Sequence, residues 1–190
     1  MKTAVIIIFD DFTDIDVFLP WDLLNRVKAF VPDFTVKIIG TGSVHTSSTG
    51  IDLATHASIE LCSTADLVVV ASGKGTRTLI KDNEFLSRIH LDPDRQVICS
   101  LCTGSLILAA LGHLKGLSAT TYPTAFDLLR SYEVDVIENE SLVIQGNIAT
   151  AAECLAAIEL MSWAIGKLFG EDISSNVLAT VTPNGKTISV

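Results

Sequence analysis

The chain has 190 residues, of which 48% are hydrophobic and 18% are charged, and this composition is typical of a globular domain rather than a disordered chain. Its net charge is −9, and the sequence contains no basic cluster, so neither nucleic acid nor an anionic membrane is an expected partner. The apolar run near the N-terminus is too short for a signal peptide, and the four cysteines fit free thiols. We therefore expect a cytoplasmic protein without a membrane anchor.

The order of the predicted elements indicates one α/β domain over residues 1–190. Continuous β-branched runs, as in buried parallel strands, alternate with helical patterns, and shorter paired runs indicate hairpins at the sheet edges. This alternation predicts an open, mostly parallel sheet with helices on both faces. The predicted strands are 3–9, 34–40, 65–71 and 95–101; the helices are 17–29, 76–90, 104–115 and 151–169; the edge hairpins are 44–48 with 51–55, and 141–150 with a tight turn at Gly146 and Asn147.

A cysteine stands where a predicted strand ends and a helix begins. Small residues flank Cys102 two positions away on each side, at Ser100 and Gly104. This is the pattern of a nucleophile elbow, a sharp turn that presents a side chain at the carboxyl edge of the sheet. The helix N-terminus would lower the pKa of the thiol. A buried packing cysteine is the alternative interpretation.

The other three cysteines do not suggest chemistry. Cys99 forms a CxxC pattern with Cys102, but it lies inside a strand, so a redox dithiol is not expected. Cys62 and Cys154 lie in apolar surroundings and are predicted to belong to the core. No set of His, Cys and Asp has the spacing of metal ligands, so we predict neither a metal nor a cofactor.

An acidic residue follows the first predicted strand. Asp16 lies between Ile15 and Val17, shortly before Pro20, which we expect in the first turn of the next helix. An acid flanked by apolar residues is a candidate for burial beside the thiol, where it could hold or deliver a proton. The alternative is a helix-capping role, and Asp14 and Asp22 compete for either role.

A glycine-containing turn follows the strand at 65–71. Ser72 and Gly73 follow the strand, and Gly75 lies just beyond them. Glycine lets a backbone N–H approach a ligand closely, which suits an oxyanion hole, although an ordinary turn is equally compatible. The GxxxxGK[ST] phosphate loop is absent from the sequence.

Taken together, these stretches resemble the ThiJ/PfpI superfamily, whose flavodoxin-like fold is similar to the class I glutamine amidotransferase domain. The segment CTGSLILAALGHLKGLSATTY at 102–122 carries the resemblance most strongly, and IDVFLPWDLL, SSTGIDL, GNIATAA and AIGKLFGEDISSNV extend it over nearly the whole chain. Cys-Thr-Gly-Ser with an Asp before the first helix is most similar to isocyanide (isonitrile) hydratases. The resemblance implies Cys102 as nucleophile, Asp16 as the essential acid, Thr103 as a third site residue and Gly73 as oxyanion donor, with a small-molecule substrate.

The chain departs from the family pattern at several positions. The protease branch has His where Thr103 stands, so proteolysis is not expected, and other branches have His in place of Tyr122. Leu19 replaces a family glycine, Ser72 replaces a residue of the Pro-Gly-Gly turn, and 151–153 lacks the usual glycines. Some relatives carry a C-terminal helix-turn-helix domain, which we do not expect in this sequence.

The sequence leaves three functions open: a cysteine-dependent hydratase or lyase, a redox-sensing or stress-response protein that uses an oxidisable Cys102, and a small-molecule hydrolase or amidase. The resemblance also implies a homodimer. The apolar side chains of Phe18, Leu19 and Trp21 suit an interface, although they could equally pack on the chain's own core.

Overall fold

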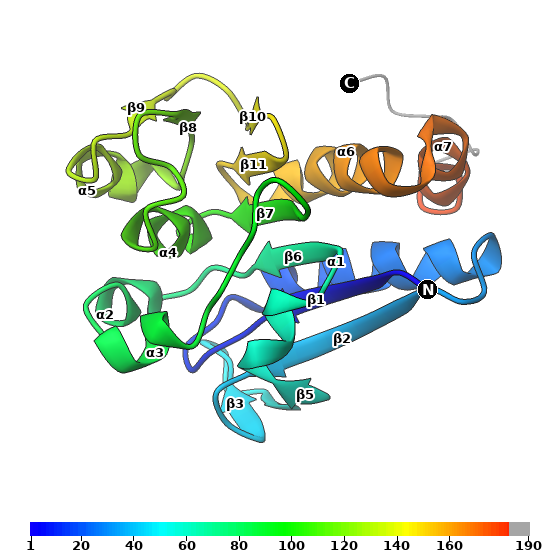
Figure 1. Cartoon of the computed structure of the whole chain (residues 1–190), viewed down its shortest axis with the longest axis horizontal. Helices are drawn as coiled ribbons and strands as arrows, with labels where there is room; N and C mark the ends of the chain where they lie inside the picture. The colour runs from blue at the N-terminus through cyan, green and yellow to red at the C-terminus, as the bar shows by residue number, and fades with distance from the viewer. Residues whose placement is uncertain (183–190) are drawn as a thin grey trace.

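A mixed, mostly parallel sheet of seven strands forms the centre of the molecule (Figure 1). The computed structural model describes residues 1–182, so residues 183–190 of the predicted domain lie outside the described residues. The strand order is β10-β11-β7-β6-β1-β2-β5, and only β10 runs antiparallel to its neighbour. The predicted fold class is therefore confirmed.

Strands and helices alternate along the described residues, and most of them are short. The strands are β1 (Thr3–Ile7), β2 (Thr35–Gly40), β3 (Val44–Thr46), β4 (Asp52–Ala54), β5 (Ala57–Ser58), β6 (Leu67–Val70), β7 (Val97–Leu101), β8 (Ser118–Ala119), β9 (Asp135–Val136), β10 (Leu142–Gln145) and β11 (Ile148–Ala151). The α-helices are α1 (Asp14–Arg26), α2 (Thr76–Leu79), α3 (Asn83–Ser87), α4 (Gly104–Ala110), α5 (Phe126–Arg130), α6 (Ala157–Phe169) and α7 (Glu171–Ala179); 3-10 helices span Val27–Ala29, Ile59–Ser63, Pro123–Ala125 and Cys154–Ala156.

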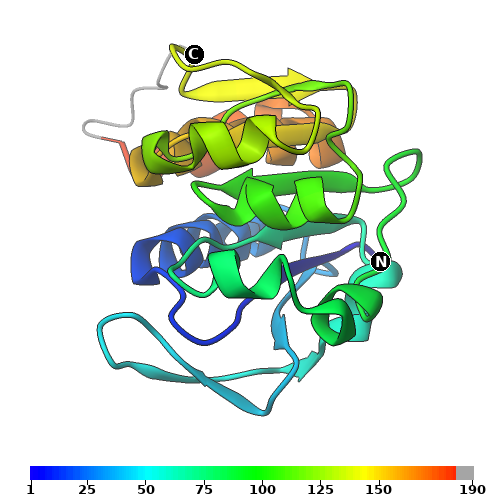
Figure 2. The same cartoon turned by 90° about the vertical axis from the view of Figure 1, so that its left-hand side faces the viewer.

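Two groups of helices pack around the sheet (Figures 1 and 2). Helices α1, α6 and α7 pack against one another, and α4 packs against α2 and α5. Between them the central strands are buried on both faces, since every residue of β6 and β7 is buried. Among the described residues, no helix combines the length and the apolar character needed to cross a membrane.

Both predicted hairpins form, but only the β10–β11 hairpin lies at an edge of the main sheet, because β3 and β4 make a separate two-stranded sheet. Strands β3 and β4 pair antiparallel, and so do β10 and β11, with Gly146 at a positive φ of 64° in the turn between them. The four predicted central strands also form, as β1, β2, β6 and β7.

All four predicted helices have different bounds. The helix predicted over 104–115 ends at Ala110, shortly before Gly112 with its positive φ of 85°. The helix predicted over 76–90 is two helices, because the Asp82 side chain accepts hydrogen bonds from the N–H groups of Glu84 and Phe85 and starts a new helix there. The helix predicted over 151–169 begins only at Ala157. The first helix begins at Asp14, so Pro20 lies inside it rather than in its first turn, and its missing N–H leaves the carbonyl of Asp16 without the usual helical partner.

The carboxyl ends of four neighbouring strands lie together at one edge of the sheet. In the register, Leu101 of β7 pairs with Ala151 of β11, and Ser100 pairs with Val70 of β6. Figure 1 shows the arrowheads of β6, β7 and β11 pointing toward the same side. The residues that follow β11, β7, β6 and β1 therefore converge there, which is where open α/β sheets bind ligands.

The turn after β7 depends on close backbone packing at Gly104. A Cβ atom added there would lie 2.5 Å from the carbonyl oxygen of Val70 and 2.8 Å from that of Ala71. We expect Gly104→Ala to lower the free energy of unfolding by about 1–3 kcal/mol, because neither backbone carbonyl can move aside without distorting the sheet. Urea unfolding followed by circular dichroism measures this.

Gly42→Ala is the matched control for Gly104→Ala. Gly42 is exposed, and its added Cβ would lie no closer than 3.3 Å to any neighbour. The control should change the unfolding free energy by less than about 0.5 kcal/mol. An equal loss in both variants would show that the contact with β6 does not matter.

Candidate active site

Cys102 has an unusual backbone conformation at the end of β7. Its φ is +45°, in the left-handed region that residues other than glycine seldom adopt. Its N–H donates to the carbonyl oxygen of Ala151 at 2.9 Å, while its own carbonyl accepts from the hydroxyls of Thr121 at 3.0 Å and Ser105 at 3.1 Å. This geometry matches the turn expected of a nucleophile elbow.

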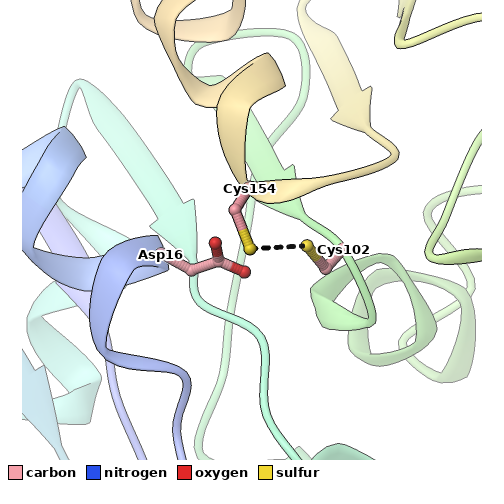
Figure 3. A group of neighbouring side chains, drawn as sticks. All are labelled: Asp16, Cys102 and Cys154. Carbon is pink, nitrogen blue, oxygen red and sulfur yellow. Dashed lines mark hydrogen bonds between the residues drawn. The ribbon is translucent and has the colours of Figure 1, made fainter.

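Three side chains meet beside this turn: those of Cys102, Asp16 and Cys154 (Figure 3). The Sγ atoms of the two cysteines lie 3.9 Å apart. These sulfurs and a carboxylate oxygen of Asp16 all lie within 4.8 Å of one another. The three residues come from the segments after β7, β11 and β1, so the cluster follows from the convergence of the strand ends.

The carboxyl group of Asp16 is completely buried in the first turn of α1. The hydroxyl of Ser72 donates a hydrogen bond to its Oδ2 atom. Its Oδ1 atom is buried without a hydrogen-bond partner. An unpaired buried carboxylate oxygen is costly, so Oδ1 is available to a hydrogen-bond donor or a cation.

The pKa of the Cys102 thiol is raised above its usual value, chiefly by burial and then by the negative charge of Asp16. The expectation of a lowered pKa is therefore wrong: α4 has only seven residues, and the field at its N-terminus does not outweigh burial beside a carboxylate. The thiol of Cys102 therefore needs a neighbouring group that takes its proton before the sulfur can act as a thiolate.

Cys154 is a functional candidate that the sequence reasoning missed. It was expected in the core, but it is only partly buried and lines the same pocket as Cys102. Burial, followed by its interactions with Asp16, raises its pKa to about 11. The available signal was its place after β11, the parallel neighbour of β7, whose carboxyl end must lie beside the elbow. Spacing along the sequence did not reveal the Cys-Cys-Asp set, since Cys102 and Cys154 are 52 positions apart.

The competing candidates lie outside this cluster. The carboxylate of Asp14 accepts a hydrogen bond from Thr49 at 3.0 Å, and that of Asp22 pairs with Arg26 at 2.7 Å. Cys99 and Cys62 are completely buried in the core, as expected. The structure thus places Asp16, and neither of the other two acids, next to the thiols.

Thr103 and Gly73 contact each other directly. The N–H of Gly73 is directed at the Thr103 hydroxyl at 3.3 Å, and that hydroxyl lies at the same distance from the carbonyl oxygen of Gly73. A Cβ at Gly73 would lie 2.6 Å from the Cα of Phe12, so this turn requires glycine. In this conformation the hydroxyl of Thr103 accepts from the N–H of Gly73, the group that the sequence suggested as an oxyanion donor.

A pocket of about 300 Å³ opens onto the cluster. A pocket of this size suits a small molecule. Among the described residues that line it, the charged ones are the cations Lys74 and Arg77. Its full lining is Thr13, Ser72, Gly73, Lys74, Arg77, Cys102, Thr103, Tyr122, Thr124 and Cys154.

Several known proteins are similar to this chain. The isonitrile hydratase of Pseudomonas putida is 31% identical over 173 residues, which cover 90% of this chain and 74% of the relative. A ThiJ/PfpI family protein from Pseudomonas syringae superposes with a TM-score of 0.84 at 21% identity, over 95% of this chain and 74% of the other. DJ-1beta of Drosophila melanogaster superposes with a TM-score of 0.80 at 19% identity, over 95% of this chain and 97% of the other. The last two likenesses show the fold alone. The profile of the DJ-1/PfpI family matches residues 2–166, and with this match the chain belongs to the DJ-1/PfpI family.

Proposed function

We propose that the protein hydrates small isocyanides to N-substituted formamides, with Cys102 as nucleophile and Asp16 as general acid and base. One observation carries the proposal: a buried carboxyl with an unpaired oxygen lies within 4.8 Å of a thiol on a left-handed elbow, beside a small pocket. The similarity to an isonitrile hydratase supports the same reaction. Reduced thiols require a reducing compartment, so we propose the cytoplasm as its location.

The first step uses the proton that Cys102 and Asp16 share. When this proton resides on Asp16, the sulfur is a thiolate and can attack the terminal carbon of R–N≡C. Asp16 then delivers the proton to the same carbon. The product is a thioimidate, Cys102–S–CH=N–R, and the carboxyl group is left as a carboxylate.

The second step adds water and restores the site. The oxygen of a water molecule bonds to the thioimidate carbon while Asp16 takes a proton from that water. Asp16 then passes this proton to the nitrogen of the thioimidate. It then takes the hydroxyl proton as the C–S bond breaks. The formamide R–NH–CHO leaves, and Cys102 and Asp16 again hold one proton between them. The overall change is the addition of one water molecule.

Thr103 has a positioning role in this mechanism. Its hydroxyl contacts both backbone polar groups of Gly73, so it fixes the turn that forms one wall of the pocket. If the hydroxyl rotates toward substrate, the Gly73 N–H becomes free to stabilise developing charge.

A redox-sensing function is the second candidate, and the 3.9 Å separation of the Cys102 and Cys154 sulfurs favours it. A peroxide would oxidise the Cys102 thiolate to sulfenic acid, and the Cys154 thiol would then displace water to form a disulfide. Absence of isocyanide turnover, together with loss of both thiols after peroxide treatment, would favour this candidate over the hydratase.

We propose that two copies of the chain form a dimer close to the site. Leu19 and Trp21 pack on the chain's own core, with Trp21 stacked on His56, so of the three expected interface residues only Phe18 is exposed. Ile15 beside Asp16 and Leu155 beside Cys154 are exposed too. These three apolar side chains flank the residues of the site.

Asp16→Asn tests the general acid and base. We expect it to lower kcat for a small alkyl isocyanide by about 100-fold or more, because the amide cannot carry the proton through either step. Formamide release measured by chromatography follows the reaction. Cys102→Ser should remove turnover entirely.

Asp14→Asn is the matched control, since Asp14 lies two positions away and bonds to Thr49 instead. It should keep kcat within about twofold of the wild type. If both Asp variants lose kcat equally, the assignment of the general acid to Asp16 is wrong. Full activity in Asp16→Asn would overturn the mechanism.

Thr103→Val tests the positioning role. The loss of two hydrogen bonds to Gly73, worth about 0.5–1.5 kcal/mol each, should lower kcat by roughly 5- to 150-fold without abolishing it. Thr103→Ser retains the hydroxyl and should restore most of the rate. If Thr103→Val lowers only the melting temperature and leaves the rate per folded molecule unchanged, the hydroxyl serves stability alone.

The dimer predicts a mass in solution of about twice the 20.3 kDa of one chain. Light scattering coupled to gel filtration at micromolar concentration measures this mass. Phe18→Glu should shift the protein toward monomer, because a charge in an apolar contact is costly to desolvate. A monomeric wild type contradicts the proposal.

A further inference from the structure

We propose that Asp16, Cys102 and Cys154 form a binding site for Zn²⁺, with three protein ligands and a fourth position open to the pocket. The cation would bind through the two thiolate sulfurs and one carboxylate oxygen. Neither the sequence spacing nor the hydratase mechanism assigns such a site. The binding itself is independent of the proposed reaction, and only its effect on catalysis rests on the proposed function.

The separation of the sulfur atoms is that of a zinc site. Two thiolates bound to Zn²⁺ at about 2.3 Å in tetrahedral geometry lie about 3.8 Å apart. The Sγ atoms of Cys102 and Cys154 are 3.9 Å apart. The carboxylate oxygen of Asp16 lies within 4.8 Å of both sulfurs, so a side-chain movement of about 1 Å closes the triangle.

The unpaired oxygen of Asp16 points independently to a ligand. Asp16 is completely buried, and its Oδ1 atom has no hydrogen-bond partner. Its Oδ2 atom accepts from Ser72, which holds the carboxyl group from behind as outer hydrogen bonds hold metal ligands. Figure 3 shows this carboxyl group directed toward the sulfurs.

A divalent cation also resolves the electrostatics of the cluster. Two thiols and a carboxyl group are packed together with little solvent, since Cys102 and Asp16 are both buried. A cation bound by all three groups would offset the negative charge that they carry as ligands. Lys74 and Arg77 line the same pocket and offset the net negative charge that remains after binding.

Zinc binding and nucleophilic catalysis would exclude each other. A Cys102 sulfur bound to the cation cannot attack an isocyanide, and Asp16 cannot carry a proton while it is a ligand. The cation would therefore hold the enzyme in a protected, inactive state until it is removed. Cys154 has no step in the proposed hydration, so this site gives it a role.

Cobalt(II) titration of the reduced, chelator-treated protein tests the site without any substrate. Co²⁺ bound by thiolates absorbs strongly in the near ultraviolet and, in four-coordinate geometry, in the visible. We expect both absorptions to saturate at one Co²⁺ per chain and to disappear when Zn²⁺ is added. The titration measures absorption and uses no substrate. A negative result therefore says nothing about isocyanide hydration, and the two proposals are tested separately.

Variants identify the ligands. Cys154→Ser and Cys154→Ala should weaken Co²⁺ binding at least tenfold and lower the near-ultraviolet absorption. Asp16→Asn should weaken binding but retain the thiolate absorption. Cys62→Ser is the control, because Cys62 is buried elsewhere beside His90, and it should bind as the wild type does. Absent thiolate absorption, saturation well below one Co²⁺ per chain, or unchanged binding in folded Cys154→Ser overturns the proposal.

Discussion

The site depends on the backbone of Cys102 being held in a left-handed conformation. For a residue with a Cβ atom this conformation costs about 1–2 kcal/mol. Three hydrogen bonds from separate elements oppose that cost: one to Ala151 on β11, and two to the cysteine carbonyl from Thr121 and Ser105. At about 0.5–1.5 kcal/mol each, they are sufficient to hold the turn. Because β11 supplies one of them, the pairing of β7 with β11 also holds the backbone of Cys102 in place.

The same pairing decides which side chains surround the thiol. The strand order β11-β7-β6-β1 aligns four carboxyl ends, and the residues after them supply Cys154, Cys102, Ser72 and Asp16 in that order. Burial at this edge disfavours the thiolate forms of Cys102 and Cys154, so both thiols hold their protons more firmly than exposed thiols do. The site therefore needs a neighbouring group or a bound cation before either sulfur can lose its proton near neutral pH.

Local sequence patterns were sufficient to predict the elbow, the acid and the central strands. Small residues around Cys102 and β-branched runs in the strands are short-range signals, and the structure has the turn and the strands where these signals indicated them. Two errors had a shared cause. Cys154 was expected in the core and the last long helix was begun too early, because the apolar residues after Ala151 do not distinguish the connecting segment and its 3-10 turn from the start of the helix. The segment after β11 meets Cys102 because β11 pairs with β7. A local sequence pattern does not specify which strands pair.

Ser72 shows how a departure from the family pattern can shape the site. The sequence alone made it a doubtful position in a glycine-rich turn, yet its hydroxyl donates to Oδ2 of Asp16. This bond engages Oδ2, while Oδ1 is buried without a hydrogen-bond partner. The orientation of the carboxyl group is thereby fixed by the turn after β6, while its position is fixed by the first turn of α1. Ser72 forms no hydrogen bond with either sulfur, yet it helps to hold the carboxyl group that lies beside them.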